Sequence, residues 1–380
     1  MFENLLYQEE VVTQLKQEIV GNSLAPALLF SGPPLSGKLT AAFELARILC
    51  CGNSKEWHCS CRQCRAHRSL SHPRTILMGQ RNLIPEISAC AELMNYNRSD
   101  TSRYLMVRSV RKLLRRFDPV LWEGGERKFA KLYSIVERLA ESVESILPGN
   151  QMPEGEKTLL NSLVDDCTEV QKALPGLLPI SQIRHVRHWA HYSAGKDHKT
   201  IIIDGAARMP DASKNALLKF LEEPPANTSI ILITDRKPIL LPTIISRLRD
   251  YPFKKRSLVQ EAEILRRVFK KKGEGGLQDF FDTWRRGTSS MIIAKQFIKQ
   301  ANSNNLPREI LEIRDLENLR GFLEALSAEL RDNWKKTAYP KHRRFLIEQN
   351  WIRDARFRAE NLNLPIPLVL RGLFYSMGGF

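Results

Sequence analysis

Apolar residues follow two spacings along this chain. Short, nearly continuous apolar runs predict buried strands, and the clearest of them are 25–30, 75–78, 200–204 and 228–234. Between these runs apolar residues recur every three or four positions, which predicts helices that pack by one face, at 39–49, 182–190 and 211–221. Strands that alternate with helices are typical of an α/β domain built on a parallel sheet.

The other long segments have helical spacing only. Residues 80–176 form one such segment, which predicts a helical insertion within the α/β domain. Beyond the last strand the pattern is helical to the end of the chain, with predicted breaks at 273–276 and 302–307. We therefore expect three domains: an α/β core over 1–253, a small helical domain over 254–302 and a helical C-terminal domain over 303–380.

Composition narrows the class of protein. The 380 residues are 43% hydrophobic, which is enough to build cores and excludes a wholly disordered chain. No apolar run approaches the ~18 residues of a membrane span, and the first ten residues lack the basic and apolar regions of a signal peptide. We expect a cytoplasmic protein without a membrane attachment.

The chain is strongly basic, with 58 Lys and Arg against 42 Asp and Glu and a formal net charge of +16. Such a charge suggests an anionic partner, nucleic acid first. Residues 241–300 hold 14 Lys and Arg against 6 Asp and Glu, and residues 103–116 are locally basic on a predicted helix. Within residues 241–300 the basic clusters are 254–256, 266–267, 270–272 and 285–286. They could contact DNA phosphates without reading sequence, and solvated helix faces explain them equally well.

A glycine-rich loop follows the first predicted strand and precedes a helix. Gly32, Gly37 and Lys38 match the GxxxxGK part of a phosphate-binding loop, in which backbone N–H groups and the lysine contact phosphate oxygens. The full motif continues with Ser or Thr, which ligates magnesium, but here Leu39 follows the lysine. Thr40 is rotated by about 100° around the helix and cannot simply replace that ligand.

A second part of the same kind of site is altered. Asp204 ends a predicted strand and could hold a metal-bound water. The next residue is Gly205, where a hydrolytic P-loop ATPase commonly keeps a glutamate base. Without a hydroxyl ligand and a base, phosphoryl transfer loses both of its positioning groups. We expect a degenerate nucleotide site, and binding of ATP or ADP there stays open.

Five of the seven cysteines lie between residues 50 and 64. An odd total in a chain expected to be cytoplasmic argues against a disulfide framework and favours metal binding. Four thiolates suit a closed, tetrahedral, structural zinc site with bonds of about 2.3 Å.

Two longer stretches resemble a known family. Residues 206–225 read AARMPDASKNALLKFLEEPP, and residues 240–248 read LLPTIISRL. They resemble the bacterial clamp-loader AAA+ subunits of DNA polymerase III, the gamma/tau and delta-prime proteins. The resemblance is strong over 1–79 and 177–256, weak over 257–380 and absent from 80–176. It implies an AAA+ P-loop parallel sheet with a zinc module, followed by a helical lid and an all-α collar domain.

Within that family gamma/tau is the working ATPase, whereas delta-prime typically has a degenerate nucleotide site and keeps a Ser-Arg pair. Leu39, Gly205 and the pair Ser246-Arg247 therefore resemble the delta-prime type. The resemblance implies that Arg247 acts in trans as an arginine finger on a neighbouring gamma subunit. It also places Thr234 at the family's sensor position, where a local structural role is expected in a degenerate site.

The family's zinc module has four cysteines spaced C-x8-C-x2-C-x2-C. The resemblance implies the ligand set Cys51, Cys59, Cys61 and Cys64, within a module at about 50–65. Cys50 would give the usual first interval, but Cys51 has the family's distance from Lys38 and is preferred. Because the interval from Cys59 to Cys61 is one residue short, His58 and His67 are kept as substitute ligands.

The resemblance further implies the partners of the chain. They are the gamma/tau and delta subunits in a hetero-oligomeric ring, the sliding clamp, and primer–template DNA at the basic surface, in a nucleoid-associated complex. Residues near the C-terminus are expected to bury against neighbouring subunits, namely Leu368, Leu370 and Phe374.

Two other functions compete with this reading. One is an active gamma/tau-type ATPase, in which Thr40 and a carboxylate such as Glu222 or Glu223 restore hydrolysis. The other is a stand-alone zinc-containing nucleic-acid-binding protein. An ATPase assay of the isolated chain tests the first alternative, and duplex binding by the monomer tests the second.

Overall fold

The chain forms two compact units, Met1–Gln278 and Asp279–Phe380, which are described separately. The structure is a computed structural model, and it describes residues 1–122, 126–151, 155–192, 198–271, 275–285, 287–301, 307, 310, 313, 316–335, 342–362 and 364–378. The expected breaks at 273–276 and 302–307, and the domain boundary at 302/303, fall largely outside these residues. The three-domain division stays a prediction.

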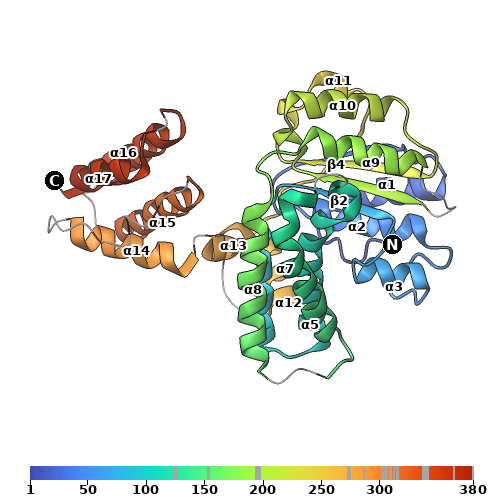
Figure 1. Ribbon diagram of the computed structural model, residues 1–380, viewed down its shortest axis with the longest axis horizontal. Coiled ribbons are helices and arrows are strands. Elements are labelled where there is room, and N and C mark those ends of the chain that lie inside the picture. The colour runs from blue at the N-terminus through green and yellow to red at the C-terminus, as the bar shows by residue number, and fades with distance from the viewer. Residues whose placement is uncertain are drawn as a thin grey trace. The chain divides into compact units, whose positions relative to one another are not determined.

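The first unit is built on a five-stranded parallel sheet with the order β2-β3-β4-β1-β5 (Figure 1). Its strands are β1 (Ala27–Ser31), β2 (Thr75–Gly79), β3 (Lys199–Asp204), β4 (Thr228–Thr234) and β5 (Arg249–Pro252). The predicted α/β fold with a parallel sheet is confirmed, and the first four strands lie within two residues of their predicted bounds. The edge strand β5 was missed because its sequence, Arg-Asp-Tyr-Pro, contains no apolar run.

Both faces of the sheet are covered, because successive strand residues point to opposite sides. Leu28 and Phe30 pack with α1 (Glu9–Val20) and α2 (Lys38–Cys50) on one face. Leu29 packs on the other face, in the core that includes α9 (Ile180–Tyr192) and α10 (Asp211–Glu222). In Figure 1 these two pairs of helices lie on opposite sides of the sheet.

The segment 80–176 is helical in its described residues, as the pattern predicts. It consists of α4 (Ile84–Tyr96), α5 (Asp100–Leu114), η1 (Arg115–Phe117), α6 (Pro119–Trp122), α7 (Glu126–Ser145) and α8 (Glu156–Ala173). α4, α5, α7 and α8 pack against one another, whereas α6 packs against α9 beside the sheet. We call this segment the insertion. α12 (Leu258–Phe269) contacts α4 of the insertion, and the Tyr96 hydroxyl of α4 donates a hydrogen bond to the Phe269 carbonyl at 2.8 Å.

The second unit contains the helices at the C-terminal end of the chain. They are α13 (Leu277–Arg285, which begins in the first unit), α14 (Gly287–Ala301), α15 (Leu316–Lys335), α16 (His342–Glu360) and α17 (Ile366–Gly378). At the centre of this core the Phe297 ring contacts the rings of Phe322 and Phe374 edge-on, with centroids 5.2 and 5.1 Å apart. None of the helices among the described residues is both long enough and apolar enough to span a bilayer.

One expectation about the C-terminal residues is corrected here. Leu370 and Phe374 are fully buried within their own unit, so they are not available to neighbouring subunits. Leu368 lies on the exposed face of α17. Helical periodicity alone could not separate these faces, because both carry apolar residues.

Candidate functional site

Parallel strand pairing brings the predicted nucleotide-site residues to one edge of the sheet. Ser31, the last residue of β1, pairs with Thr234 at the end of β4. Asp204, the last residue of β3, pairs with Gly79 at the end of β2. Because the carboxyl ends of parallel strands share an edge, the phosphate loop (residues 32–38), Asp204 and Thr234 meet there.

The two glycines of the phosphate loop are required by backbone geometry and by space. Gly32 has φ of 135°, and a Cβ at this residue would lie 2.3 Å from the carbonyl oxygen of Phe253. Gly37 has φ of 97°, and a Cβ there would lie 2.8 Å from Nη2 of Arg256. Both values of φ fall in the region that favours glycine. The Arg256 guanidinium also donates to the Leu35 carbonyl at 2.6 Å and thereby fixes the loop.

Lys38 lies inside the loop, with only 4% of the residue exposed. Its Nζ donates to the Gly32 carbonyl at 2.7 Å and to Ser36 Oγ at 3.2 Å. Burial, and to a smaller extent the positive charge of Arg81, lowers the pKa of Lys38 to about 8. The negative charges of Asp235 and Asp204 act in the other direction and raise this pKa. The amine therefore lies at the edge of the sheet, within electrostatic reach of Asp204.

The two residues after the lysine provide no ligand at this edge. Leu39 is buried in the core formed by the sheet, α1 and α2, where a hydroxyl ligand would stand in a complete motif. Thr40, the next residue on α2, has an exposed side chain. The position after the lysine thus serves packing.

Asp204 is paired with a residue that the sequence pattern did not single out. Arg81 approaches it with two nitrogens: Nε lies 2.7 Å from Oδ2, and Nη2 donates to Oδ1 at 2.9 Å. The Asp204 side chain is only 3% exposed. Burial alone would lower the pKa of Arg81, but the charge and hydrogen bond of Asp204 hold it above its ordinary value. The only sequence signal for Arg81 is its position two residues after β2, and it has meaning only once β2 is known to pair with β3.

Gly205 and Thr234 complete this edge. Gly205 has φ of 85° and ψ of 37°, just before η2 (Ala206–Arg208). A glutamate base here would be strained, because side-chain-bearing residues disfavour this conformation. Thr234 is buried, and its Oγ1 accepts a hydrogen bond from the Arg236 N–H at 3.0 Å. Its hydroxyl is used within its own turn.

These residues do not fit a catalytic magnesium ion. Leu39 stands where the hydroxyl ligand would be, and Gly205 offers no base. The carboxylate of Asp204 forms an ion pair with Arg81. Among the described residues, two groups of His, Cys, Asp or Glu are close enough to share an ion, and neither includes Asp204.

Arg247 lies at the opposite edge of the sheet. It directly follows α11 (Pro242–Ile245) and Ser246, and one residue separates it from the start of β5. Arg249, the first residue of β5, pairs with Leu28, three residues before β1 ends. At about 3.3 Å per strand residue, the full length of β1 separates Arg247 from the phosphate loop.

The Arg247 side chain is held at the surface. Its Nη2 donates to Glu222 Oε1 at 2.8 Å, and its Nη1 donates to the Thr243 carbonyl at 2.8 Å. Glu222, one carboxylate that could have restored hydrolysis, is therefore occupied at this edge and not at the phosphate loop.

The cysteine module forms a second candidate site. Cys51, Cys59, Cys61 and Cys64 have their sulfur atoms within 4.8 Å of one another. The sulfurs of Cys51 and Cys59 are 3.7 Å apart, close to the edge of about 3.8 Å of a tetrahedron with zinc–sulfur bonds of about 2.3 Å. Cys51, Cys59 and Cys64 are buried, and α3 (Arg62–Arg68) carries the last of the four. The donor set and its spacing fit a structural zinc ion.

The structure separates Cys50 from this group. Its sulfur donates to the His198 carbonyl at 3.3 Å and lies near His67 and His72. The rings of His67 and His72 are stacked, with centroids 3.9 Å apart and planes 14° apart. His67 and His72 thus lie beside Cys50 and outside the group of four cysteines. His58 is exposed and outside both groups, so neither histidine replaces a cysteine ligand.

Arg47 of α2 links the cysteine module to the helix that follows the phosphate loop. It is buried, forms an ion pair with Glu44, and donates to Cys64 Sγ at 3.2 Å. The same guanidinium donates to the carbonyls of Lys55 and Glu56 at 2.9 and 2.8 Å. A cation beside four thiolates offsets the net negative charge that they would keep around a divalent ion.

The locally basic helix of the insertion is also used internally. Arg111 of α5 donates to the Ser69 carbonyl at 2.8 Å. Arg115 donates to the carbonyls of Leu70 and His72 at 2.8 and 2.7 Å. These carbonyls lie at or just beyond the C-terminal end of α3, where positive charge is favourable. The cationic groups of Arg111 and Arg115 therefore fasten the insertion to the cysteine module.

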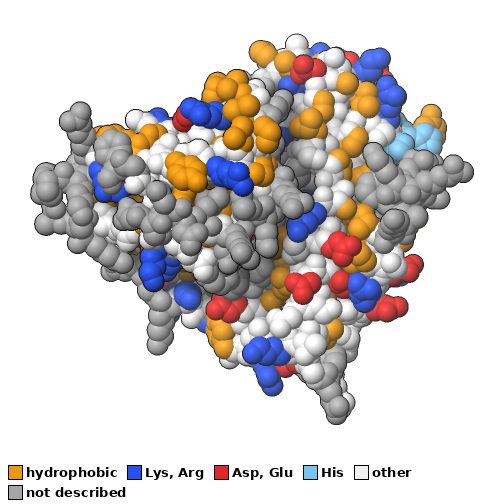
Figure 2. Space-filling view, turned by 60° about the vertical axis from the view of Figure 1, so that its left-hand side comes forward, with side chains coloured by type: hydrophobic (Ala, Val, Ile, Leu, Met, Phe, Trp, Pro, Cys, Tyr) orange, Lys and Arg blue, Asp and Glu red, His pale blue; other side chains and the backbone are white. Residues whose placement is uncertain are grey.

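The basic residues after β5 are mostly exposed. Lys254 and Arg266 form ion pairs with Glu10 and Glu263, whereas Arg256 is buried against the phosphate loop. On the face drawn in Figure 2, the Lys and Arg side chains of the described residues lie among hydrophobic and acidic ones. Lys272 and Arg286, members of the predicted basic clusters, lie outside the described residues.

Comparison with known proteins finds similarity to subunits of DNA polymerase III. The family model described as "DNA polymerase III, delta subunit" matches residues 7–257. The DNA polymerase III subunit delta' of Haemophilus influenzae is 30% identical over 156 residues, which cover 41% of this chain and 40% of that protein. The subunit delta' of Bacillus subtilis is 34% identical over 125 residues, covering 33% and 36% of the two proteins. A gamma/tau subunit of Mycobacterium bovis is 36% identical over 90 residues, covering 23% and 15%. The matched parts thus span two fifths of these relatives or less.

Proposed function

The chain belongs to the DNA polymerase III delta subunit family, and from this membership we propose that it is a delta-prime-type, non-catalytic subunit of a clamp loader. One observation carries the proposal. At the edge of the sheet with the phosphate loop, Leu39 follows the lysine and Asp204 forms an ion pair with Arg81, while the opposite edge presents the exposed side chain of Arg247. A subunit with this arrangement contributes to a neighbour's reaction more readily than to its own.

The proposed role of Arg247 is that of an arginine finger in trans. A guanidinium stabilises the charge that spreads over a transferring phosphoryl group, and such fingers contribute about 10³–10⁵ to the rate. The position of Arg247, separated from its own phosphate loop by the length of β1, supports action on a nucleotide bound to a neighbouring gamma/tau-type subunit.

The proposed role of the four-cysteine group is to hold a structural zinc ion. Cys51, Cys59, Cys61 and Cys64 would be its ligands and would leave no open coordination position. A zinc ion in such a closed site stabilises the fold of its module.

The proposed partners are the gamma/tau and delta subunits of a hetero-oligomeric ring, the sliding clamp and primer–template DNA. The relatives' names, which make them subunits of DNA polymerase III, support this assignment. The exposed lysines after β5, such as Lys255 and Lys271, are candidates for contacts with DNA phosphates. Action in replication would place the chain in the cytoplasm, at the nucleoid.

The competing function is an active gamma/tau-type ATPase, which the retained Gly32, Gly37 and Lys38 favour. ATP turnover by the isolated chain that Lys38→Ala abolishes would support it and overturn our proposal. In a reconstituted loader, we expect Arg247→Ala to reduce DNA-stimulated hydrolysis by the partner subunits without preventing assembly. Arg249→Ala, which removes an exposed arginine two residues away, is the matched control and should leave hydrolysis unchanged.

A further inference from the structure

The insertion supplies a cation to the carboxylate that would hold magnesium in a complete site. Arg81, at the beginning of the insertion, binds both carboxylate oxygens of Asp204 at 2.7 and 2.9 Å. From this geometry we infer that Arg81 takes the place of the magnesium ion at Asp204, so that the edge of the sheet is electrostatically complete without a metal. The insertion then has a function at the nucleotide site, which is to neutralise the charge of Asp204.

The Asp204 carboxylate is buried. A carboxylate with 3% of its side chain exposed is costly without a cation or several hydrogen-bond donors. A magnesium ion binds one or two carboxylates together with substrate phosphates and water. The Arg81 guanidinium donates to one carboxylate oxygen and lies in ion-pair contact with the other, so it meets the same electrostatic need without phosphate.

Arg81 is held in place by another residue of the insertion. Arg116, from η1, donates from Nη1 to the Arg81 carbonyl at 2.6 Å and is only 2% exposed. Burial lowers the pKa of Arg116 to about 10, and the negative charge of Asp204 opposes that shift. A second positive charge therefore lies behind the Arg81 backbone and within electrostatic reach of the same carboxylate.

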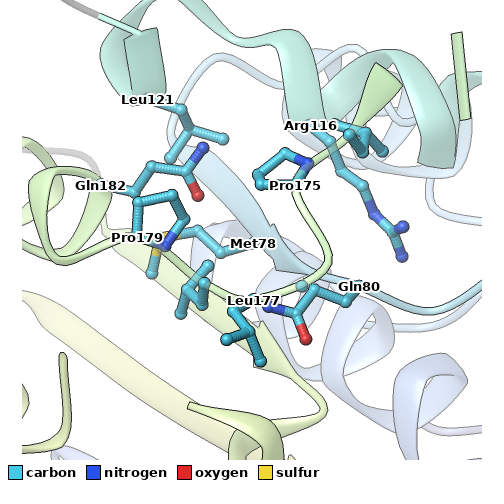
Figure 3. A pocket seen from close by; sticks show the side chains of 11 residues that line it. Met78, Gln80, Arg116, Leu121, Pro175, Leu177, Pro179 and Gln182 are labelled. Carbon is cyan, nitrogen blue, oxygen red and sulfur yellow. The ribbon is translucent and has the colours of Figure 1, made fainter. Parts of the chain in front are cut away.

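The insertion joins the sheet at a junction beside β2. A small pocket lies there, with side chains from both ends of the insertion around it (Figure 3). Gln80, the first residue of the insertion, and Arg116 of η1 line it, as do Pro175 near the end of the insertion and Leu177 just beyond it. The two ends of the insertion thus meet beside β2, which keeps Arg81 next to the pairing of Gly79 with Asp204.

This inference rests on the proposed function in one respect, namely that the site does not hydrolyse ATP. Its test needs no partner subunit. Failure of this test would therefore leave the proposed role of Arg247 untouched, and failure of the loader assay would leave this inference untouched.

The test is the thermal stability of the full chain with and without millimolar magnesium chloride, at matched ionic strength and without chelators that would strip zinc. Arg81→Met removes the cation and keeps much of the side-chain volume. Arg138→Met is the matched control, because Arg138 binds both oxygens of Asp166 at 2.8 and 2.6 Å within the insertion, but at an exposed site. The double variant Arg81→Met with Asp204→Asn removes both charges.

We expect Arg81→Met to lower the melting temperature by about 5 °C or more and magnesium to restore part of the loss. Magnesium should not change the melting temperature of the wild type, of Arg138→Met or of the double variant. No recovery of Arg81→Met by magnesium would overturn the inference, as would equal recovery of the double variant. If Arg81→Met does not fold, Arg81→Gln keeps hydrogen-bond donors without the charge, and the same magnesium response decides.

Discussion

Arg247 and Glu222 form an ion pair, with Nη2 2.8 Å from Oε1, at the edge of the sheet opposite the phosphate loop. The two side chains are 35% and 48% exposed. An ion pair that water reaches this easily contributes about 0–1 kcal/mol. Arg247 can therefore leave Glu222 at small cost when a phosphate on another subunit offers a stronger contact.

The exposed pair leads to a first prediction. Glu222→Gln should change the free energy of unfolding by no more than about 1 kcal/mol, since the pair is solvated. In a reconstituted loader it should leave DNA-stimulated hydrolysis close to the wild-type rate, whereas Arg247→Ala should lower that rate by at least about tenfold. Equal loss of hydrolysis in both variants would show that Glu222 is needed to position the guanidinium.

Metal content gives a second prediction. The purified wild-type chain should contain about one zinc ion, because four sulfurs at tetrahedral spacing form one closed site. Cys51→Ser should lose most of this zinc and lower the melting temperature, while Cys50→Ser, its matched neighbour, should keep both. Elemental analysis and thermal denaturation measure these outcomes. Zinc retained in Cys51→Ser and lost in Cys50→Ser would reverse the ligand assignment.

A third prediction concerns the buried amine of Lys38. Its pKa falls from 10.5 to about 8 on folding, mainly through burial. Between these two values the unfolded chain binds more protons than the folded chain, so Lys38 makes stability rise as the pH rises. Below about pH 8 both states are protonated and this gain is absent.

Lys38→Met tests that dependence. The free energy of unfolding of the wild type, minus that of the variant, should increase by about 2–3 kcal/mol from pH 7.5 to pH 10. Chemical denaturation at several pH values measures the difference and cancels the titration of all other groups. A difference that stays flat, or falls as pH rises, would contradict the burial of a charged amine in the loop.

A fourth prediction concerns the exposed face of α17. Leu368 and Tyr375 are 59% and 58% exposed, whereas Leu370 and Phe374 are fully buried. If the C-terminal unit joins the proposed ring, Leu368→Asp should weaken assembly with partner subunits by about tenfold or more and leave the melting temperature of the isolated chain unchanged. Arg371→Ala, on the same exposed helix, should assemble normally. Sedimentation of the mixed subunits distinguishes the two variants.

Much of the fold was predictable because its signals are local. Each of the first four strands is a short apolar run, and the helices between them keep their periodicity, since both faces of the sheet are buried. β5 escaped prediction because a four-residue edge strand carries too little apolar sequence. The buried face of α17 escaped prediction for a different reason, because apolar residues occupy both its buried and its exposed face.

The candidate site was only partly predictable, and Arg81 shows why. The loss of the hydroxyl at Leu39 and of the base at Gly205 can be read from a few consecutive residues. The cation that compensates at Asp204 lies 123 residues away along the chain. No local pattern marks it, because its position depends on β2 pairing with β3.

The sequence by itself determined the family resemblance, the phosphate loop, the departures at Leu39 and Gly205 from a complete motif, and the cluster of cysteines, since each is read from residues close in the chain. The tertiary structure brought Cys51, which the resemblance preferred, and not Cys50 together with the other three cysteines. It also placed Arg247 at the far edge of the sheet and directed the basic helix α5 to the end of α3. These outcomes depend on the order of parallel strands and on the packing of an insertion, in which the contacting groups are distant in sequence and meet only after the chain has folded.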